Sequence, residues 1–253
     1  MSSTTGADRP RTSASLGPLD GRTAVVTGAS RGIGLATARA LITAGAHVIL
    51  VSRSADALRE LAEPLGERAT PVVCDVTEAD AVVAAAQRIQ RELGAAPHIL
   101  VNNAGAFELA SVERMDAATF TTTVHANLVA PFLFMRAVLP AMRARGDGHI
   151  VTIGSVADRV VFPENGAYAA SKHGVRALHE VLRLELRGTG VRTTLVSPGP
   201  VDTTLWDPVD PDSRPGFTPR SAMLRPEHVA DAVLYALTRS RDVNVDELRL
   251  SRS

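Results

Sequence analysis

Residues 23–34 read TAVVTGASRGIG, an apolar run followed by a glycine-rich turn. The first five residues are apolar or β-branched, which is typical of a strand buried on both faces. Gly28, Gly32 and Gly34 come next, and the apolar pattern of a helix then runs to Gly45. A strand, a glycine turn and a helix in this order let backbone N–H groups approach a pyrophosphate at the positive end of the helix. The spacing G-x-x-x-G-x-G differs from the best-known dinucleotide fingerprint, G-x-G-x-x-G, so the rest of the chain has to support this interpretation.

The chain beyond this turn alternates between strand and helix patterns. Strands are predicted at 47–51, 70–76, 98–101, 149–153, 191–196 and 243–250, and helices at 54–65, 78–93, 116–144, 165–188 and 226–239, with Thr77 as the N-cap of the second of these helices. The alternation predicts an α/β fold, a single-domain doubly wound parallel sheet (Rossmann-like) with helices on both faces, over residues 21–253. Residues 1–20 are rich in Ser, Thr, Gly, Arg and Pro, which predicts a disordered tail.

Glycines and polar residues gather where the predicted strands end. They are Gly28 to Gly34, Ser52, Asp75, Asn102, Ser155 and Pro198. Ligands of open parallel sheets bind at the carboxyl ends of the strands. The sequence therefore predicts one binding site along this edge of the sheet.

The end of the second strand carries a signal for the type of dinucleotide. An acid at this place binds the ribose 2′-hydroxyl of NAD, whereas an arginine accommodates the 2′-phosphate of NADP. This chain has Ser52 and then Arg53, with Arg31 as a second candidate partner for the phosphate. These residues favour NADP(H). The alternative is that Arg53 only opens the helix at 54–65 on the surface.

The stretch Tyr168-Ala-Ala-Ser-Lys172 is a candidate for acid–base chemistry. Lys172 is the only lysine of the chain, and Tyr168 is one of two tyrosines. Residues four apart lie on the same face of a helix. An ammonium beside the phenol is expected to lower the tyrosine pKa from about 10 and to make proton transfer feasible at neutral pH. The alternative is an incidental pair on a surface helix.

Two further features concern burial and access. Asn127 lies among apolar residues in the helix predicted at 116–144, which indicates a buried amide that needs partners, although an exposed asparagine is the alternative. The segment 200–225 is rich in Pro and Asp and contains the only tryptophan, Trp206. We expect this segment to be a substrate lid in which Trp206, Leu205 and Phe217 cover the ligand. The alternative is that Trp206 packs permanently on the domain.

Composition narrows the classes of function. Lys plus Arg and Asp plus Glu both number 27, giving a net charge of 0 and a pI of about 7.1, so nucleic acid and anionic membranes are not expected as partners. The single cysteine, Cys74, excludes an intramolecular disulfide and a cysteine-based metal cluster. No uninterrupted apolar run reaches the roughly 18 residues of a membrane span, and the first residues lack a signal-like apolar region. These features predict a cytoplasmic protein.

Taken together, the motifs resemble those of the short-chain dehydrogenase/reductase family over residues 20–250. They are TGASRGIG at 27–34, Asp75-Val76, NNAG at 102–105, Asn127, Ser155, YAASK at 168–172 and Pro198-Gly199. The resemblance implies a catalytic tetrad of Asn127, Ser155, Tyr168 and Lys172, and no metal. The expected contacts of NADP(H) are Gly28, Ser30, Arg31, Gly32, Ile33, Gly34, Ser52, Arg53, Asp75, Val76, Asn103, Ala104, Gly105, Tyr168, Lys172, Pro198, Gly199, Val201 and Thr203.

The resemblance also implies an activity, namely NADPH-dependent hydride transfer to the carbonyl of a small molecule. In this implied reaction, Tyr168 donates a proton to the carbonyl oxygen and Ser155 stabilises that oxygen. Lys172 holds the nicotinamide ribose, and Asn127 positions a water. The sequence VNVDELRL at 243–250 looks like the branch of NADP-dependent reductases and 3-hydroxy-acid or serine-type dehydrogenases. Oxidation of a hydroxy acid or amino alcohol is therefore the runner-up, and a non-catalytic dinucleotide sensor is the third candidate. Apolar residues on two faces of the helices at 116–144 and 165–188, together with the resemblance, predict a homodimer or homotetramer.

Overall fold

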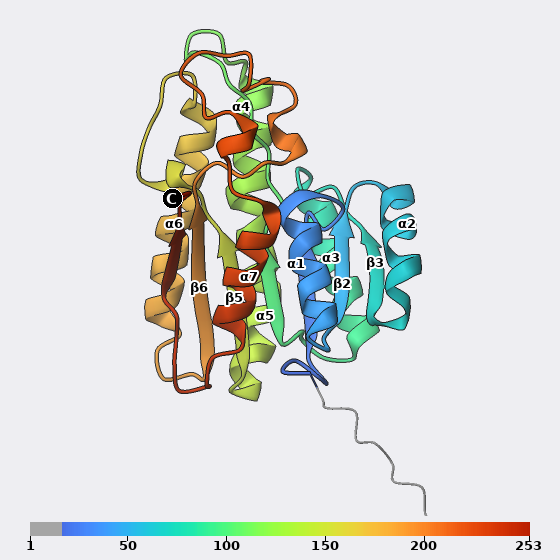
Figure 1. Ribbon diagram of the computed structural model, residues 1–253. Helices are drawn as coiled ribbons and strands as arrows, with labels where there is room; N and C mark the ends of the chain where they lie inside the picture. Colours follow the sequence, from blue (N-terminus) through green and yellow to red (C-terminus); the bar gives the residue numbers. More distant parts are fainter. Residues whose placement is uncertain (1–16) are drawn as a thin grey trace, which may run out of the picture.

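In the computed structural model, which describes residues 17–253, the chain forms one seven-stranded sheet (Figure 1). Its order is β3-β2-β1-β4-β5-β6-β7, and every neighbouring pair is parallel. The strands are β1 (Thr23–Thr27), β2 (His47–Ser52), β3 (Ala69–Val73), β4 (Ile99–Asn102), β5 (Gly148–Ile153), β6 (Val191–Pro198) and β7 (Glu247–Leu250). The strand order reverses between β1 and β4, which is the point where such sheets bind ligands.

Helices cover both faces of the sheet, which confirms the predicted doubly wound α/β fold. The main helices are α1 (Gly32–Thr43), α2 (Ala55–Leu65), α3 (Ala79–Leu93), α4 (Ala117–Val124), α5 (Ala130–Arg145), α6 (Gly166–Glu185) and α7 (Pro226–Leu237). In Figure 1, α1 and α7 lie in front of the sheet, while α3 and α5 lie behind it. Because all the strands are parallel, their carboxyl ends lie at one edge of the sheet.

Side-chain alternation along β1 shows how the two layers are held. Ala24 and Val26 belong to the apolar core beneath α1 and α7, whereas Val25 belongs to the core beneath α3 and α5. All three side chains are at most 1% exposed. Helices on both faces require apolar residues at successive positions, which is why the strands read as unbroken apolar runs.

The region around Asp75 differs from the sequence prediction. Strand β3 ends at Val73, so Asp75 follows the strand and does not end it. Helix α3 has Glu78 as its N-cap residue, and the proposed cap by Thr77 is wrong. The reason is that the backbone N–H and hydroxyl of Thr77 both donate to Oδ1 of Asp75, at 2.9 and 2.8 Å, in a turn that precedes the helix.

The helix predicted at 116–144 is continuous but irregular. A π-helical segment, His125–Val129, separates α4 from α5. By length and composition alone, the stretch Ala117–Arg145 contains a window apolar enough to cross a membrane, with a mean hydropathy of 1.4, although polar residues interrupt its apolar run. In the fold, its residues Phe134 and Met142 are buried in the core against the sheet, as in the central helix of an α/β domain.

Both ends of the chain differ from the predicted boundaries. Residues 17–20 were expected in the tail, but Leu19 is buried and its N–H donates to the carbonyl of Ala44 at 2.9 Å. The rest of the predicted tail, residues 1–16, lies outside the described residues. At the other end, the last strand is shorter than predicted because β7 begins only at Glu247.

Candidate active site

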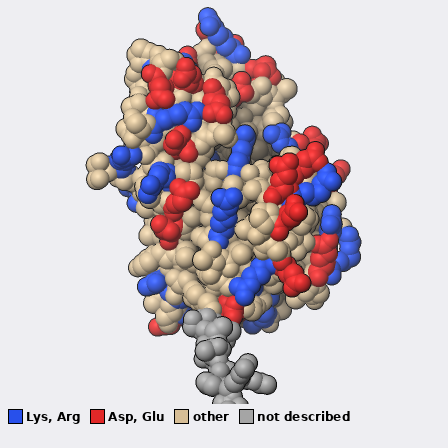
Figure 2. All heavy atoms as spheres, turned by 45° about the vertical axis from the view of Figure 1, so that its right-hand side comes forward, with Lys and Arg blue, Asp and Glu red and all other residues tan. Residues whose placement is uncertain are grey.

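A large cleft of about 1120 Å³ lies at the carboxyl ends of the strands. Figure 2 shows a hollow in this region with basic side chains at its edge. It contains nearly all the predicted site residues, namely Gly28, Ser30, Arg31, Gly32, Ile33, Ser52, Arg53, Asp75, Val76, Asn103, Ala104, Gly105, Ser155, Tyr168, Lys172, Pro198, Gly199, Val201 and Thr203. Two predicted residues, Gly34 and Asn127, lie behind the lining.

The glycine turn has the shape of an anion cradle. Gly28 and Gly32 have φ angles of +67° and +54°, which favour glycine. Within the described chain, the N-cap residue Arg31 makes no side-chain capping bond and the first turn of α1 contains no acid, so its N–H groups remain available to an anion. A Cβ on Gly34 would lie 2.2 Å from the carbonyl oxygen of Gly28, so this glycine is needed for packing beneath the turn.

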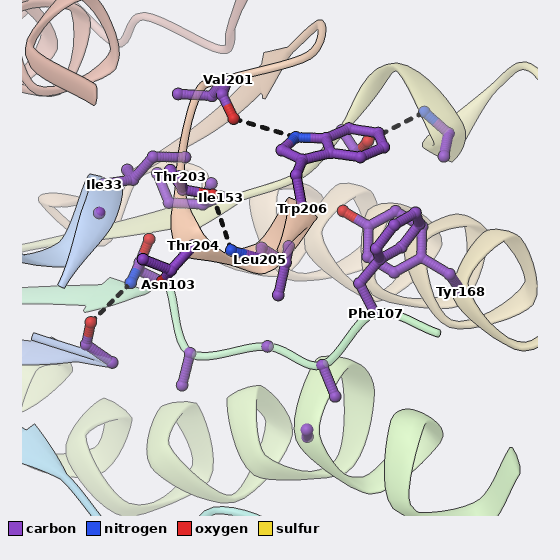
Figure 3. A pocket seen from close by; sticks show the side chains of 18 of the residues that line it. Ile33, Asn103, Phe107, Ile153, Tyr168, Val201, Thr203, Thr204, Leu205 and Trp206 are labelled. Atoms are coloured by element: carbon purple, nitrogen blue, oxygen red, sulfur yellow. Dashed lines mark hydrogen bonds between the residues drawn. The ribbon is translucent and has the colours of Figure 1, made fainter. Parts of the chain in front are cut away.

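Asn103 ties the glycine turn to the next strand of the site. Its Nδ2 donates to the carbonyl oxygens of Thr27 at 2.9 Å and Gly28 at 3.3 Å, and Figure 3 draws one of these bonds as a dashed line. In return, Oγ1 of Thr27 accepts from the backbone N–H groups of Asn103 and Ala104, both at 3.0 Å. The two strand ends at the switch point are thereby held in one arrangement.

The end of β2 presents hydroxyls and arginines to the cleft. Oγ of Ser52 donates to Oγ of Ser30 at 2.9 Å, while Arg31 and Arg53 are exposed at the cleft edge. The position that carries an acid in NAD-binding relatives of this fold is occupied by Ser52. The glycine cradle and these donors fit the phosphates of a dinucleotide.

Tyr168 and Lys172 lie on α6, one turn apart, as predicted. Lys172 is 6% exposed, its Nζ donates to the carbonyl oxygen of Ile153 at 2.9 Å, and Nζ lies 5.6 Å from the centre of the Tyr168 ring. Burial lowers the pKa of Lys172 to about 8, and the negative charge of Asp158 opposes this shift. The ammonium therefore sits beside the ring and is held by a backbone carbonyl of β5.

The pKa of Tyr168 moves in the direction opposite to the sequence prediction. Burial raises it, a hydrogen bond with Ser155 lowers it, and the charge of Asp158 raises it further. The expectation that Lys172 lowers this pKa is wrong for this structure, because desolvation of the phenolate is the largest effect. The phenol is thus held in its protonated form.

Sequence reasoning missed Asp158, a fully buried carboxylate beneath the site. It accepts from the hydroxyl of Ser197 at 2.5 Å and from the backbone N–H of Ser155 at 3.4 Å, and it pairs with Arg159. The spacing Ser155-x-x-Asp158 resembles a capping box and was the available signal. Because the carboxylate binds the backbone of Ser155, it also fixes the start of the turn that carries the Ser155 hydroxyl.

Asn127 lies in the π-helical segment and is 1% exposed. Its Oδ1 accepts from the N–H of Ala106 at 2.8 Å, and its Nδ2 donates to the carbonyl of Ala106 and to Oγ of Ser171, both at 2.9 Å. The prediction of a buried, fully partnered asparagine is confirmed. Its amide joins the loop after β4 to helix α6, which carries Tyr168.

The rings of Phe107 and Trp206 lie close to Tyr168 (Figure 3). The ring of Phe107 lies 4.9 Å from that of Tyr168 and 5.1 Å from that of Trp206, and Phe217 follows at 6.3 Å from Trp206. Nε1 of Trp206 donates to the carbonyl of Val201 at 3.1 Å. Sequence analysis included Trp206 and Phe217 but missed Phe107, which gave no signal in its loop.

The segment 200–225 covers this end of the cleft. It contains two 3₁₀ turns, Thr204–Trp206 and Arg220–Ala222. Arg220 pairs with Asp202 at 2.7 Å and Asp207 at 2.6 Å, which ties the segment to itself. Leu205, Trp206 and Phe217 all line the cleft, as expected for a lid, while movement of the segment remains a prediction.

The fold and the cleft define a dinucleotide-dependent oxidoreductase. The family model for short chain dehydrogenase matches residues 22–214. An uncharacterized oxidoreductase of Staphylococcus haemolyticus is 36% identical over 91% of this chain and 96% of its own. A glycine betaine reductase of Emericella nidulans is 39% identical over 92% of this chain, which spans only 19% of that protein. This chain belongs to the short-chain dehydrogenase/reductase family.

Solved structures agree with this assignment. A metagenomic short-chain oxidoreductase in complex with NADP has a TM-score of 0.80 and 33% identity, covering 93% of this chain and 99% of that chain. The closed form of a serine dehydrogenase complexed with NADP⁺ has a TM-score of 0.81 and 31% identity, covering 90% of this chain and 94% of that chain. These likenesses support a nicotinamide dinucleotide as the cofactor of this chain.

Proposed function

We propose that this protein reduces a carbonyl group of a small molecule, with NADPH as the hydride donor. The observation that carries the proposal is the protonated phenol of Tyr168, hydrogen-bonded to Ser155 and open to the cleft. A general acid must hold its proton until the carbonyl oxygen develops negative charge. Burial raises the pKa of Tyr168, so the phenol enters the reaction protonated, as the reductive direction requires.

Four residues of the chain have separate roles in the proposed reaction. Tyr168 donates its proton to the carbonyl oxygen, and the Ser155 hydroxyl donates a hydrogen bond to the same oxygen and stabilises the developing charge. Lys172, fixed on the carbonyl of Ile153, places a cation behind the phenol as it loses its proton. Asn127 holds the loop at Ala106 against helix α6 through its side-chain hydrogen bonds. The nicotinamide supplies the hydride when the dinucleotide is bound.

The preference for NADP(H) rests on the end of β2. Arg53 and Arg31 offer charge for a 2′-phosphate, and Ser52 leaves no carboxylate to repel it. The NADP in the metagenomic relative supports the same preference. If Arg53 is only a surface residue, its substitution should leave the ratio of kcat/KM for NADPH over NADH unchanged.

Arg53→Ala tests the cofactor preference. A charge-assisted hydrogen bond to a phosphate contributes about 1.5–3 kcal/mol, so the ratio of kcat/KM for NADPH over NADH should fall about ten- to a hundred-fold. Arg31→Ala should lower the same ratio, and the double variant should lower it most. Arg59→Ala, which removes an exposed arginine of α2 outside the cleft, is the matched control. Equal losses for both cofactors would disprove the 2′-phosphate role.

Tyr168→Phe tests the chemistry. The substitution removes the transferable proton and keeps the ring against Phe107, so NADPH should bind with unchanged affinity while kcat falls by about 10²–10⁴. Binding is measured by the fluorescence of the reduced nicotinamide, and turnover by its absorbance. Near-wild-type kcat would show that Tyr168 is not the general acid.

Oxidation of a hydroxy acid or amino alcohol is the second candidate. The likeness to the NADP⁺ complex of serine dehydrogenase favours it. Assays with NADP⁺ and a panel of serine and 3-hydroxy acids, run beside NADPH with aldehydes and ketones, compare the two directions. A kcat/KM at least about tenfold higher for the hydroxy acids would reverse our assignment.

We also propose that the protein is a cytoplasmic homodimer or homotetramer that binds neither nucleic acid nor membranes. Phe132 on α5 and Val181 and Leu184 on α6 are 43%, 52% and 52% exposed in the single chain. Apolar side chains on these two helices are suited to burial against a second copy. The balanced charge of the chain supports the rest of this proposal.

A further inference from the structure

The half of the cleft beyond Tyr168 contains a row of aromatic side chains in its lining. Phe107 packs edge-on against both Tyr168 and Trp206, and Phe217 continues the row. Leu205 lines the cleft beside them. These rings come from two separate segments, the loop after β4 and the segment after β6, and they meet only in the folded protein. A wall of this kind binds a flat apolar group through burial and edge-to-face contacts.

Charge in this half of the cleft is unfavourable for an anion. Apart from Lys172, the only charged side chain among the described lining residues here is Glu164. Lys172 is buried and its Nζ is bonded to the carbonyl of Ile153. A substrate carboxylate that entered would therefore approach a carboxylate and would find no free cation among the described lining residues, which makes its desolvation costly.

The cation that faces Glu164 is already engaged. The guanidinium of Arg214 pairs with the carboxylate of Glu164 and lies 4.8 Å from the centre of the Phe217 ring. This contact joins the lid segment to the loop before α6, at the mouth of the aromatic half. Trp206 offers no donor either, because its Nε1 already donates to the carbonyl of Val201.

From this arrangement we infer that the substrate is a ketone or aldehyde that has no carboxylate and carries an aryl or similarly large, flat apolar group. The inference deepens the proposed function and rests on it. The aryl group lies along Phe107, Trp206 and Phe217, with the carbonyl at Tyr168 and Ser155. Glu164 and Arg214, as a pair, select against a carboxylate on the substrate.

Four β-keto compounds test the inference as matched pairs. Methyl benzoylacetate and benzoylacetate share one ketone and differ in charge, while methyl acetoacetate and acetoacetate repeat the comparison without the ring. With NADPH, kcat/KM for methyl benzoylacetate should exceed that for benzoylacetate, and that for methyl acetoacetate, by about tenfold or more.

Variants connect the selectivity to its residues. Glu164→Gln removes the repelling charge and releases Arg214, so the gap between the acid and the ester should narrow by about tenfold. Glu60→Gln, an exposed acid of α2 outside the cleft, should leave the gap unchanged. Phe217→Leu keeps an apolar side chain without the ring and lies two rings away from Tyr168, so it should lower kcat/KM for the aryl ester and spare methyl acetoacetate.

The outcomes separate this inference from the proposed function. Turnover of benzoylacetate equal to or better than that of the neutral aryl ester would overturn the inference while leaving carbonyl reduction intact. Equal kcat/KM for the aryl and methyl esters would do the same. Absence of turnover of every carbonyl, with NADPH shown to bind, would overturn the proposed function and the inference together.

Discussion

Two buried histidines should make the fold sensitive to mild acid. His149 on β5 and His179 on α6 are each 1% exposed. His149 Nε2 bonds Thr194 Oγ1 at 2.8 Å, and His179 Nδ1 bonds Thr152 Oγ1 at 2.9 Å. The other ring nitrogen of each histidine has no partner among the described residues, so protonation would bury an N–H that has no acceptor.

Burial lowers the pKa of His149 to about 3 and that of His179 to about 4, from an ordinary value of 6.5, with the positive charges of Arg192 and Arg183 acting in the same direction on the respective rings. A depressed histidine pKa means that the unfolded state binds more protons. The free energy of unfolding is therefore not reduced by these histidines above pH 6.5. It falls as the pH drops from 6.5 toward the pKa values of the two rings in the folded state. At pH 5, each ring costs about 2 kcal/mol, from 1.5 pH units at about 1.36 kcal/mol each, or about 4 kcal/mol for the pair.

Urea unfolding at pH 8, 7, 6 and 5, at one protein concentration, measures this loss. The double variant His149→Gln/His179→Gln keeps hydrogen-bonding groups that do not titrate. The difference between the variant and the wild type at pH 8 gives the packing loss and is subtracted. The wild type should then lose about 4 kcal/mol more than the variant between pH 8 and pH 5. Parallel curves of unfolding free energy against pH would refute the reasoning.

Two further predictions concern the site and the assembly. Asp158→Asn should move the alkaline limb of the pH profile of kcat/KM for carbonyl reduction to lower pH. The reason is that the Asp158 carboxylate raises the pKa of both Tyr168 and Lys172. If the limb does not move, the charge of Asp158 does not influence the phenol. The chain should self-associate at micromolar concentration, and Leu184→Glu should weaken the association because this side chain is 52% exposed on α6 in the single chain. Light scattering that shows a monomer for the unsubstituted chain would contradict this prediction.

The sequence was sufficient for the fold and for the location of the site, because both depend on patterns that are local in the chain. Strand runs and the residues that follow them placed Gly28, Ser52 and Ser155 at one edge, and the cleft lies there. The ends of the strands and helices were predicted less accurately. Strand β3 ends two residues before Asp75 because the N–H of Thr77 donates to the Asp75 carboxylate in a turn that follows the strand. Whether each of these residues contacts the dinucleotide remains a prediction.

What the sequence missed depends on segments that meet only on folding. Phe107 lies in an irregular loop, and its role as a wall follows from contact with Trp206, about one hundred residues later. The direction of the Tyr168 pKa was wrong for the same reason, because the burial that raises it comes from segments that pack around Tyr168 only on folding. Helical spacing places Lys172 on the same face as Tyr168, and the carbonyl of Ile153, on β5, accepts a hydrogen bond from its ammonium.

The single lysine of the chain can now be explained by its surroundings. The chain uses arginine at every other strongly basic position, so lysine at 172 is not a matter of general composition. Lys172 is buried with one backbone carbonyl as its hydrogen-bond acceptor, and burial brings its pKa to about 8. An arginine there would bury five donors around a charge that does not titrate in proteins, with only one of them satisfied. An ammonium suits the space, matches the single acceptor, and keeps a pKa close enough to neutrality for its charge to respond when Tyr168 gives up its proton.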